Sequence, residues 1–120
     1  MAVRRKSERR KLIEEADRLL KQLVLQRDLY RCVMCGRQDR LQVSHLLPKG
    51  KYPRLRFELL NTVLMCVGCH LYWWHRNPLE AHEWLDQRFP GRREQLRIMA
   101  ATAPKLDLKE LIAGLRLEVK

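Results

Sequence analysis

The stretch Cys32–Cys69 reads CVMCGRQDRLQVSHLLPKGKYPRLRFELLNTVLMCVGC and begins and ends with a Cys-x-x-Cys pair. Each pair, Cys32/Cys35 and Cys66/Cys69, offers two thiolates from one turn, and two pairs complete a closed tetrahedral metal site. We therefore expect a structural Zn²⁺ ion that ties the two ends of the stretch together. Free buried thiols or two redox dithiols are the alternatives, although no βαβ pattern surrounds the cysteines.

Between the two cysteine pairs, the pattern predicts two short strands joined by a basic loop. Residues 40–46 alternate in character as a half-buried strand does, and residues 62–65 are suited to a second strand that pairs with the first. The connecting loop contains Pro48, Gly50 and Pro53. Four of its side chains are expected to contact nucleic-acid phosphates: Lys49, Lys51, Arg54 and Arg56. A merely solvated loop is the alternative.

The N-terminal part of the chain predicts a basic arm followed by one amphipathic helix. Ser7 is a suitable helix cap, and the helix should stop near Tyr30 after roughly 20 residues. Its apolar stripe, which we expect to pack on the core, is Leu12, Ala16, Leu19, Leu20, Leu23 and Val24. The arm, a candidate for non-specific phosphate contacts, carries Arg4, Arg5, Lys6, Arg9, Arg10 and Lys11. The helix also offers a surface for a homodimer.

After the second cysteine pair, the sequence predicts further helices. The second pair opens a helix that runs through His75, and Asn77 caps another that ends near Phe89. A third helix covers residues 92–101. Asp107 caps the last helix, whose apolar set is Leu108, Leu111, Ile112, Leu115 and Leu117. Four aromatic side chains are expected to pack a small core rather than to stack on bases: Tyr72, Trp73, Trp74 and Trp84.

Length and charge restrict the class of protein. A chain of 120 residues suits one compact domain, which we divide into a basic arm and helix (1–27), a core (28–90) and C-terminal helices that pack on it (91–120). The formal net charge of +11 favours a polyanionic partner. Nucleic acid is preferred to a membrane, because no segment approaches the roughly 20 apolar residues that a span requires. No export signal is recognisable, so a cytoplasmic location is expected.

Three side chains between and after the cysteine pairs point to chemistry. His45 lies near the end of the first predicted strand, Asn61 precedes the second, and His70 directly follows Cys69. A strand, a loop, a strand and a helix that carry His, Asn and His in this order resemble the HNH (His-Me finger) nucleases over roughly residues 28–90. The resemblance implies an α+β fold: a small ββα-metal core with a four-cysteine zinc knuckle, flanked by helices. Within the family, the chain most resembles phage NinG (Rap)-type recombination nucleases and related phage HNH proteins. The resemblance lies in the Ser44-His45 pair, the basic loop that leads into residues 55–58, and the Cys-x-x-Cys-His run into an aromatic helix.

The resemblance implies metal-dependent hydrolysis of DNA phosphodiester bonds that leaves 5′-phosphate ends. It implies that His45 is the general base, a role suited to a side chain with a pKa near ~6.5. It further implies that Asn61 holds the loop that orients this base, and that His70 binds a catalytic Mg²⁺ or Mn²⁺ ion. Arg56 is a candidate for stabilising charge in the transition state. A role in phage recombination, within the cytoplasm of a bacterial host, would follow.

One position departs from the family pattern. Many members carry Asp or His directly before the base, whereas this chain carries Ser44, a weak metal ligand. Either His70 and His75 hold the ion with water and substrate phosphate, or an acid such as Glu58 contributes. His75 is an equally good candidate for a ligand and for a surface residue, because in an α-helix the positions i and i+4, not i and i+5, share a face. His82 is interpreted as a surface or packing residue.

Two other functions would use the same zinc site and charge. One is a non-catalytic, zinc-stapled module that binds nucleic acid. The other is an interaction domain whose N-terminal helix pairs with a partner or with itself. A module that only binds nucleic acid does not require His45, Asn61 and His70 together. Their presence therefore favours the nuclease. A sharp salt dependence of DNA affinity would count against the interaction domain.

Overall fold

The computed structural model describes residues 5–119, so Arg4 of the predicted arm lies outside the described residues. Helix α1 (Glu8–Arg27) begins where predicted, because the Ser7 hydroxyl accepts a hydrogen bond of 3.1 Å from the backbone N–H of Arg10. It ends before the predicted Tyr30. Leu29 and Tyr30 adopt positive φ angles of 58° and 57°, which the helix cannot continue through.

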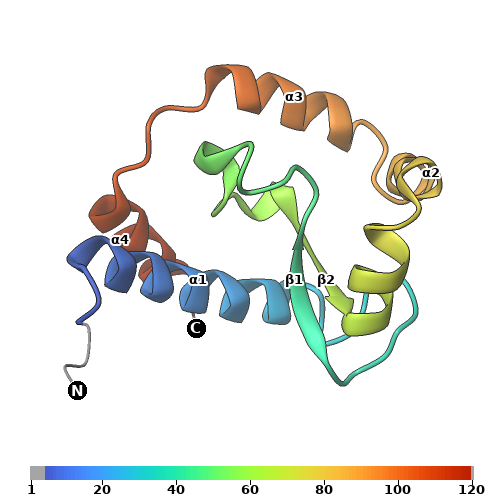
Figure 1. Cartoon of the computed structure of the whole chain (residues 1–120), viewed down its shortest axis with the longest axis horizontal. Helices are drawn as coiled ribbons and strands as arrows, with labels where there is room; N and C mark the ends of the chain where they lie inside the picture. The colour runs from blue at the N-terminus through green and yellow to red at the C-terminus, as the bar shows by residue number, and fades with distance from the viewer. Residues whose placement is uncertain (1–4, 120) are drawn as a thin grey trace.

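The two predicted strands are present and pair antiparallel. Strand β1 (Leu41–His45) and strand β2 (Thr62–Cys66) form a two-stranded sheet in which His45 faces Thr62. One face packs against α1 through Leu41, Val43 and Leu64. The other packs against an aromatic cluster through Val63 and Met65. Because both faces are covered, every residue of β2 is buried (Figure 1).

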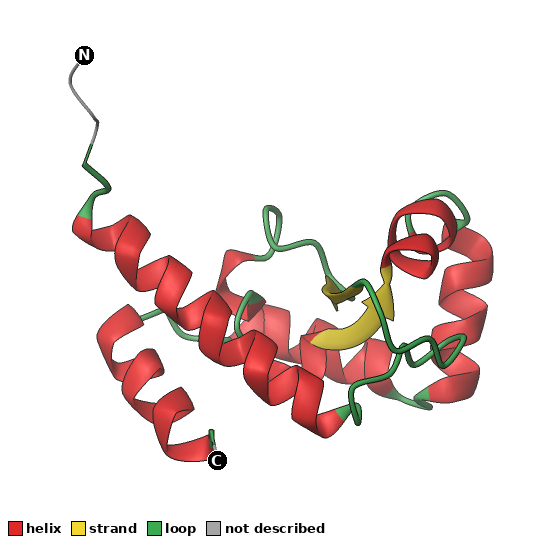
Figure 2. Cartoon of the chain, turned by 90° about the horizontal axis from the view of Figure 1, so that it is seen from below, coloured by secondary structure: helices red, strands yellow, loops and turns green. Residues whose placement is uncertain are grey.

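Short helical turns and four further helices complete the chain. The loop between the strands contains the 3₁₀ turns η1 (Pro53–Leu55) and η2 (Leu59–Asn61). After β2 follow η3 (Gly68–Trp74), α2 (Pro78–Arg88), α3 (Arg92–Thr102) and α4 (Leu108–Glu118). Helix α4 begins where the Asp107 carboxylate accepts the backbone N–H of Glu110, as predicted. Figure 2 shows α4 lying alongside α1, and Ile112 and Leu115 join the apolar stripe of α1 in one core.

The predicted core of tryptophans is confirmed. Trp84 contacts Trp73, Trp74 and Phe89 edge-on, with ring centroids 6.1–6.3 Å apart. This arrangement suits the opposite charge of ring edges and ring faces. The cluster covers the sheet face opposite α1, so all three tryptophans of the chain belong to the half of the molecule that contains the cysteines.

Three local predictions are wrong. Asn77 precedes α2, but its side-chain amide donates to the Trp73 carbonyl at 3.1 Å instead of capping the helix. Tyr72 is 62% exposed and lies beneath the Arg76 guanidinium, 5.3 Å away, because η3 turns it outward. Leu117 is 88% exposed at the end of α4, where no core element reaches it.

The observed class is α+β, as predicted: helices surround a small two-stranded antiparallel sheet that carries a cluster of four cysteines. Within residues 5–119, no helix combines the length and the apolar character needed to cross a membrane.

Candidate functional site

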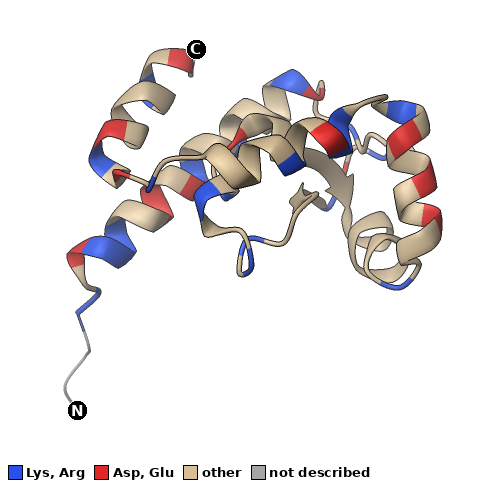
Figure 3. Cartoon of the chain, turned by 90° about the horizontal axis from the view of Figure 1, so that it is seen from above, with Lys and Arg blue, Asp and Glu red and all other residues tan. Residues whose placement is uncertain are grey.

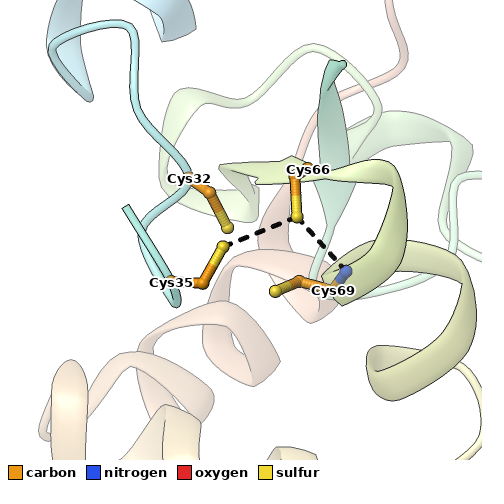
Figure 4. Close-up of side chains that lie close together, drawn as sticks. All are labelled: Cys32, Cys35, Cys66 and Cys69. Atoms are coloured by element: carbon orange, nitrogen blue, oxygen red, sulfur yellow. Dashed lines mark hydrogen bonds between the residues drawn. The ribbon is translucent and has the colours of Figure 1, made fainter. Parts of the chain in front are cut away.

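The four cysteines come together in a cluster that could hold a metal ion, as the sequence predicts. Their Sγ atoms all lie within 4.8 Å of one another, and Figure 4 shows the side chains converging from two turns of the chain. Cys35 Sγ and Cys66 Sγ are 3.6 Å apart. Tetrahedral Zn²⁺ with Zn–S bonds of about 2.3 Å places sulfurs about 3.8 Å apart. The cluster is therefore compatible with structural zinc, and it joins the segment before β1 to the end of β2.

Local backbone geometry prepares the cysteines for a cation. Gly36 has a φ of 80° and closes the first turn, in which its N–H donates to the Cys32 carbonyl at 2.9 Å. Burial opposes ionisation of Cys32, but hydrogen bonds from neighbouring backbone groups outweigh it and lower the pKa of that thiol to about 7. Burial and the neighbouring cysteines raise the pKa of Cys69. Thiolates packed this closely repel one another, so full ionisation requires a bound cation.

His45 is held in one tautomer at the end of β1. Its Nε2 lies 2.8 Å from the carbonyl oxygen of Arg56. A carbonyl only accepts hydrogen bonds, so Nε2 carries the proton and Nδ1 retains a free lone pair. Burial lowers the pKa of His45, helped by the nearby charges of Lys49 and Arg56. The ring is therefore neutral at pH 7 and able to act as a base.

Asn61 is fully buried and ties the two ends of the β1–β2 loop together. Its Oδ1 accepts the backbone N–H of Leu47 at 2.8 Å. Its Nδ2 donates to the carbonyls of Leu47 at 3.1 Å and Leu55 at 3.2 Å. Leu47 follows β1 closely and Leu55 precedes Arg56, so this one amide holds together the segments that present His45 and its carbonyl partner.

Two arginines hold the segment that contains Asn61. The Arg27 guanidinium donates to the carbonyls of Leu59 at 2.7 Å and Thr62 at 2.6 Å. Arg92, at the start of α3, donates to the carbonyl of Leu60 at 2.9 Å. Carbonyls on both sides of Asn61 are thus fixed from α1 and α3, which makes these helices part of the support of the site.

His70 and His75 lie side by side because η3 is a π-helix. A π-helix closes i to i+5 hydrogen bonds, which brings residues five apart onto one face. The two ring centroids are accordingly 4.8 Å apart. His70 Nδ1 lies 2.7 Å from the side-chain oxygen of Gln42 on β1, so it carries the proton and leaves Nε2 free as a ligand. Burial first, and then His75 and His45, lower the pKa of His70.

Ser44 and Glu58 add no carboxylate to this pair. Ser44 is fully buried, and its hydroxyl has no hydrogen-bond partner among the described residues. The Glu58 carboxylate instead accepts the backbone N–H of Leu60 at 3.3 Å. Across residues 5–119, the cysteines are the only group of three or more potential ligands, so no acid joins His70 and His75.

The four basic side chains of the loop differ in their surroundings. Lys49 and Lys51 are exposed. Arg54 donates to the Ala103 carbonyl at 3.1 Å, and the Arg56 guanidinium binds both carboxylate oxygens of Asp17, at 2.7 and 3.3 Å. Figure 3 shows basic residues on the loop and near the start of α1, with acidic residues interspersed on the helices. The two lysines are the loop cations without an ion pair or a backbone carbonyl partner in the described chain.

Sequence reasoning missed four residues that shape the site: Asp17, Arg27, Gln42 and Arg92. Each acts on a residue far along the chain, so no local spacing signals it.

Comparison of the chain with protein-family models, curated proteins and solved structures finds no match.

Proposed function

We propose that this chain is a metal-dependent endonuclease of the HNH type, with DNA as its substrate and His45 as its general base. The observation that carries the proposal is the hydrogen bond from His45 Nε2 to the Arg56 carbonyl, which leaves Nδ1 as a proton acceptor. His70 lies near enough to His45 to interact with it electrostatically, its ring contacts that of His75, and its free nitrogen is fixed by Gln42. Two imidazoles whose tautomers are set by hydrogen bonds, His45 and His70, support hydrolysis more than simple binding.

The residues divide the work of phosphodiester hydrolysis. His45 Nδ1 takes a proton from water as the water attacks phosphorus. The Arg56 carbonyl keeps the ring oriented, and its bond to Nε2–H strengthens when the ring becomes positively charged. Asn61 keeps the loop in the geometry that this bond needs. Each role corresponds to a hydrogen bond that is already formed in the free protein.

The histidine pair suits a divalent transition ion. His70 Nε2 and the adjacent ring of His75 supply two nitrogen donors, which Mn²⁺ accepts more readily than the oxygen-seeking Mg²⁺. Water and a substrate phosphate would complete the shell. When bound, such an ion stabilises negative charge on the phosphate and on the leaving 3′ oxygen. We therefore expect Mn²⁺ to support cleavage better than Mg²⁺.

The charge of the chain supports DNA as the partner. The formal net charge is +11, and the exposed Lys49 and Lys51 lie on the loop that separates His45 from Asn61. Lysines contact phosphates without reading bases, so binding should depend on salt and only weakly on sequence. Non-specific or structure-specific cleavage, as in phage DNA recombination or processing, is the corresponding role.

The proposal is tested by nicking of supercoiled plasmid and of a branched DNA in Mg²⁺ or Mn²⁺. His45→Ala should lose roughly 10²–10⁴-fold in rate. His82→Ala is the matched control, because His82 is an exposed histidine on α2 without a role in the site. Zinc content and circular dichroism establish that each variant is folded. Equal rates in His45→Ala and wild type, or no cleavage by wild type, would overturn the proposal.

The second candidate function is a non-catalytic, zinc-stapled module that binds nucleic acid. It is favoured by Ser44, which stands where many HNH nucleases carry a metal-binding Asp or His, and by the lack of a carboxylate grouped with His70 and His75 in the described chain. DNA binding without cleavage in any divalent ion would identify this function. The affinity would then be unchanged by His45→Ala.

A further inference from the structure

We propose that Asp17, on α1, is a positioning residue for the base His45 and acts through Arg56. This inference rests on the proposed nuclease function. Helix α1 lies outside the part of the chain that resembles HNH nucleases, so the family pattern assigns Asp17 no role. The structure connects the Asp17 carboxylate to the His45 ring through a single intervening residue.

The connection consists of two sets of hydrogen bonds to Arg56. Its guanidinium makes a bidentate interaction with Asp17. Nη2 donates to Asp17 Oδ2 at 2.7 Å, and Nε donates to Oδ1 at 3.3 Å. The carbonyl of the same residue accepts His45 Nε2–H at 2.8 Å. A bidentate pair of this kind restricts orientation as well as distance. Fixing the Arg56 side chain on α1 therefore restricts the direction of its carbonyl.

The ion pair is better suited to positioning than to stabilising the fold. The side chains of Arg56 and Asp17 are 26% and 42% exposed, and ion pairs in contact with water contribute little to stability. The neighbouring carbonyl of Leu55 is already held by Asn61. Among the described residues, no side chain other than His45 hydrogen-bonds to the carbonyl of Arg56, and the Arg56 side chain is held by Asp17. Loss of Asp17 should therefore leave the fold intact and loosen the hydrogen bond to His45.

Asp17 also balances charge around the base. Lys49 and Arg56 disfavour a positively charged His45, whereas the Asp17 carboxylate favours it. Proton transfer from water creates that positive charge. The carboxylate therefore lies where it offsets the two cations while His45 holds the proton.

The test compares Asp17→Asn and Asp17→Ala with Glu14→Gln as the matched control. Glu14 lies on the same helix with 45% side-chain exposure, and its ion pairs with Lys6 and Arg10 do not involve Arg56. Both Asp17→Asn and Glu14→Gln remove one negative charge, so a general effect on DNA affinity is shared. Zinc content and circular dichroism verify the fold of every variant.

Two measurements report on the orientation of His45. The first is solvent exchange of the His45 Nε2–H proton, measured by NMR on zinc-loaded protein and assigned with His45→Ala. We expect exchange to accelerate about tenfold or more in Asp17→Ala and to stay unchanged in Glu14→Gln. The second is cleavage. We expect kcat to fall by about 10–10²-fold while KM for DNA stays constant, because misorientation of a catalytic group affects the chemical step.

The outcomes separate this inference from the proposed function. Unchanged proton exchange in Asp17→Ala overturns the role of Asp17, whether or not the protein cuts DNA. If wild type does not cut DNA, the nuclease proposal fails while the exchange experiment still decides the positioning. In the double variant Asp17→Ala/Arg56→Ala, kcat should be no lower than in Arg56→Ala alone, since both act through one contact. Additive losses would overturn the inference.

Discussion

A neutral imidazole has one donor and one acceptor nitrogen, and its partner decides which is which. His45 donates from Nε2 to the Arg56 carbonyl, whereas His70 donates from Nδ1 to the Gln42 side-chain oxygen. The two rings therefore present opposite free nitrogens. Under the proposed function, these single hydrogen bonds would suit His45 to accept a proton and His70 to bind a metal ion.

The burial of His45 predicts the pH dependence of cleavage. Because burial lowers the pKa of His45, the neutral form, which the proposed function requires, persists as the pH falls through the ordinary histidine pKa of about 6.5. We expect kcat/KM to be level between pH 7 and 8 and to decline only below about pH 6.5. A pH–rate profile with zinc-loaded protein measures this. An acid limb centred above pH 7 would contradict the burial of the base.

At the scale of elements, the π-helix η3 determines whether His75 belongs to the site. We expect His75→Ala to require at least about tenfold more Mn²⁺ for half-maximal cleavage, because the ion would lose a ligand. Arg76→Ala is the matched control, since Arg76 follows His75 directly but lies over Tyr72. A metal titration of nicking compares the two variants. Equal Mn²⁺ requirements would place His75 outside the metal shell.

The elements that could be predicted from the sequence are those determined by interactions between residues close together in the chain. Ser7 and Asp107 cap their helices through contacts within one turn, and the alternation in residues 40–46 reflects the pleat of one strand. The π-helix could not be predicted, because the spacing argument assumed α-helical geometry, in which His70 and His75 diverge. The partners Asp17 and Gln42 could not be predicted because folding alone brings them to the site.

At the scale of the whole molecule, we expect metal binding by the four cysteines to keep the half that contains the aromatic cluster folded. We expect a strong chelator to unfold this half and to abolish cleavage, because four uncompensated thiols cannot hold β2 to the segment before β1. Since every tryptophan of the chain packs in this half, tryptophan emission should shift to the red and recover when zinc is restored. His45→Ala, which removes no zinc ligand, should respond identically. A spectrum unchanged by complete zinc removal would contradict this role.

The surface charge predicts how binding responds to salt. Lys49→Ala and Lys51→Ala should each reduce the slope of log affinity against log salt by about 1, if each lysine neutralises one phosphate. Lys109→Ala is the control, because Lys109 is an exposed cation on α4. Fluorescence anisotropy with labelled DNA at several salt concentrations measures the slopes. An unchanged slope in both loop variants would remove the loop from the binding surface.

The cysteine cluster joins parts of the chain that are synthesised at different times. Cys32 and Cys35 leave the ribosome before His45, whereas Cys66 and Cys69 leave after it, directly followed by His70. A nascent chain that ends before β2 thus contains His45 but has neither a partner for β1 nor a complete set of thiols. The cysteine cluster, and with it the sheet that it joins to the preceding segment, can therefore form only after translation has passed the second cysteine pair.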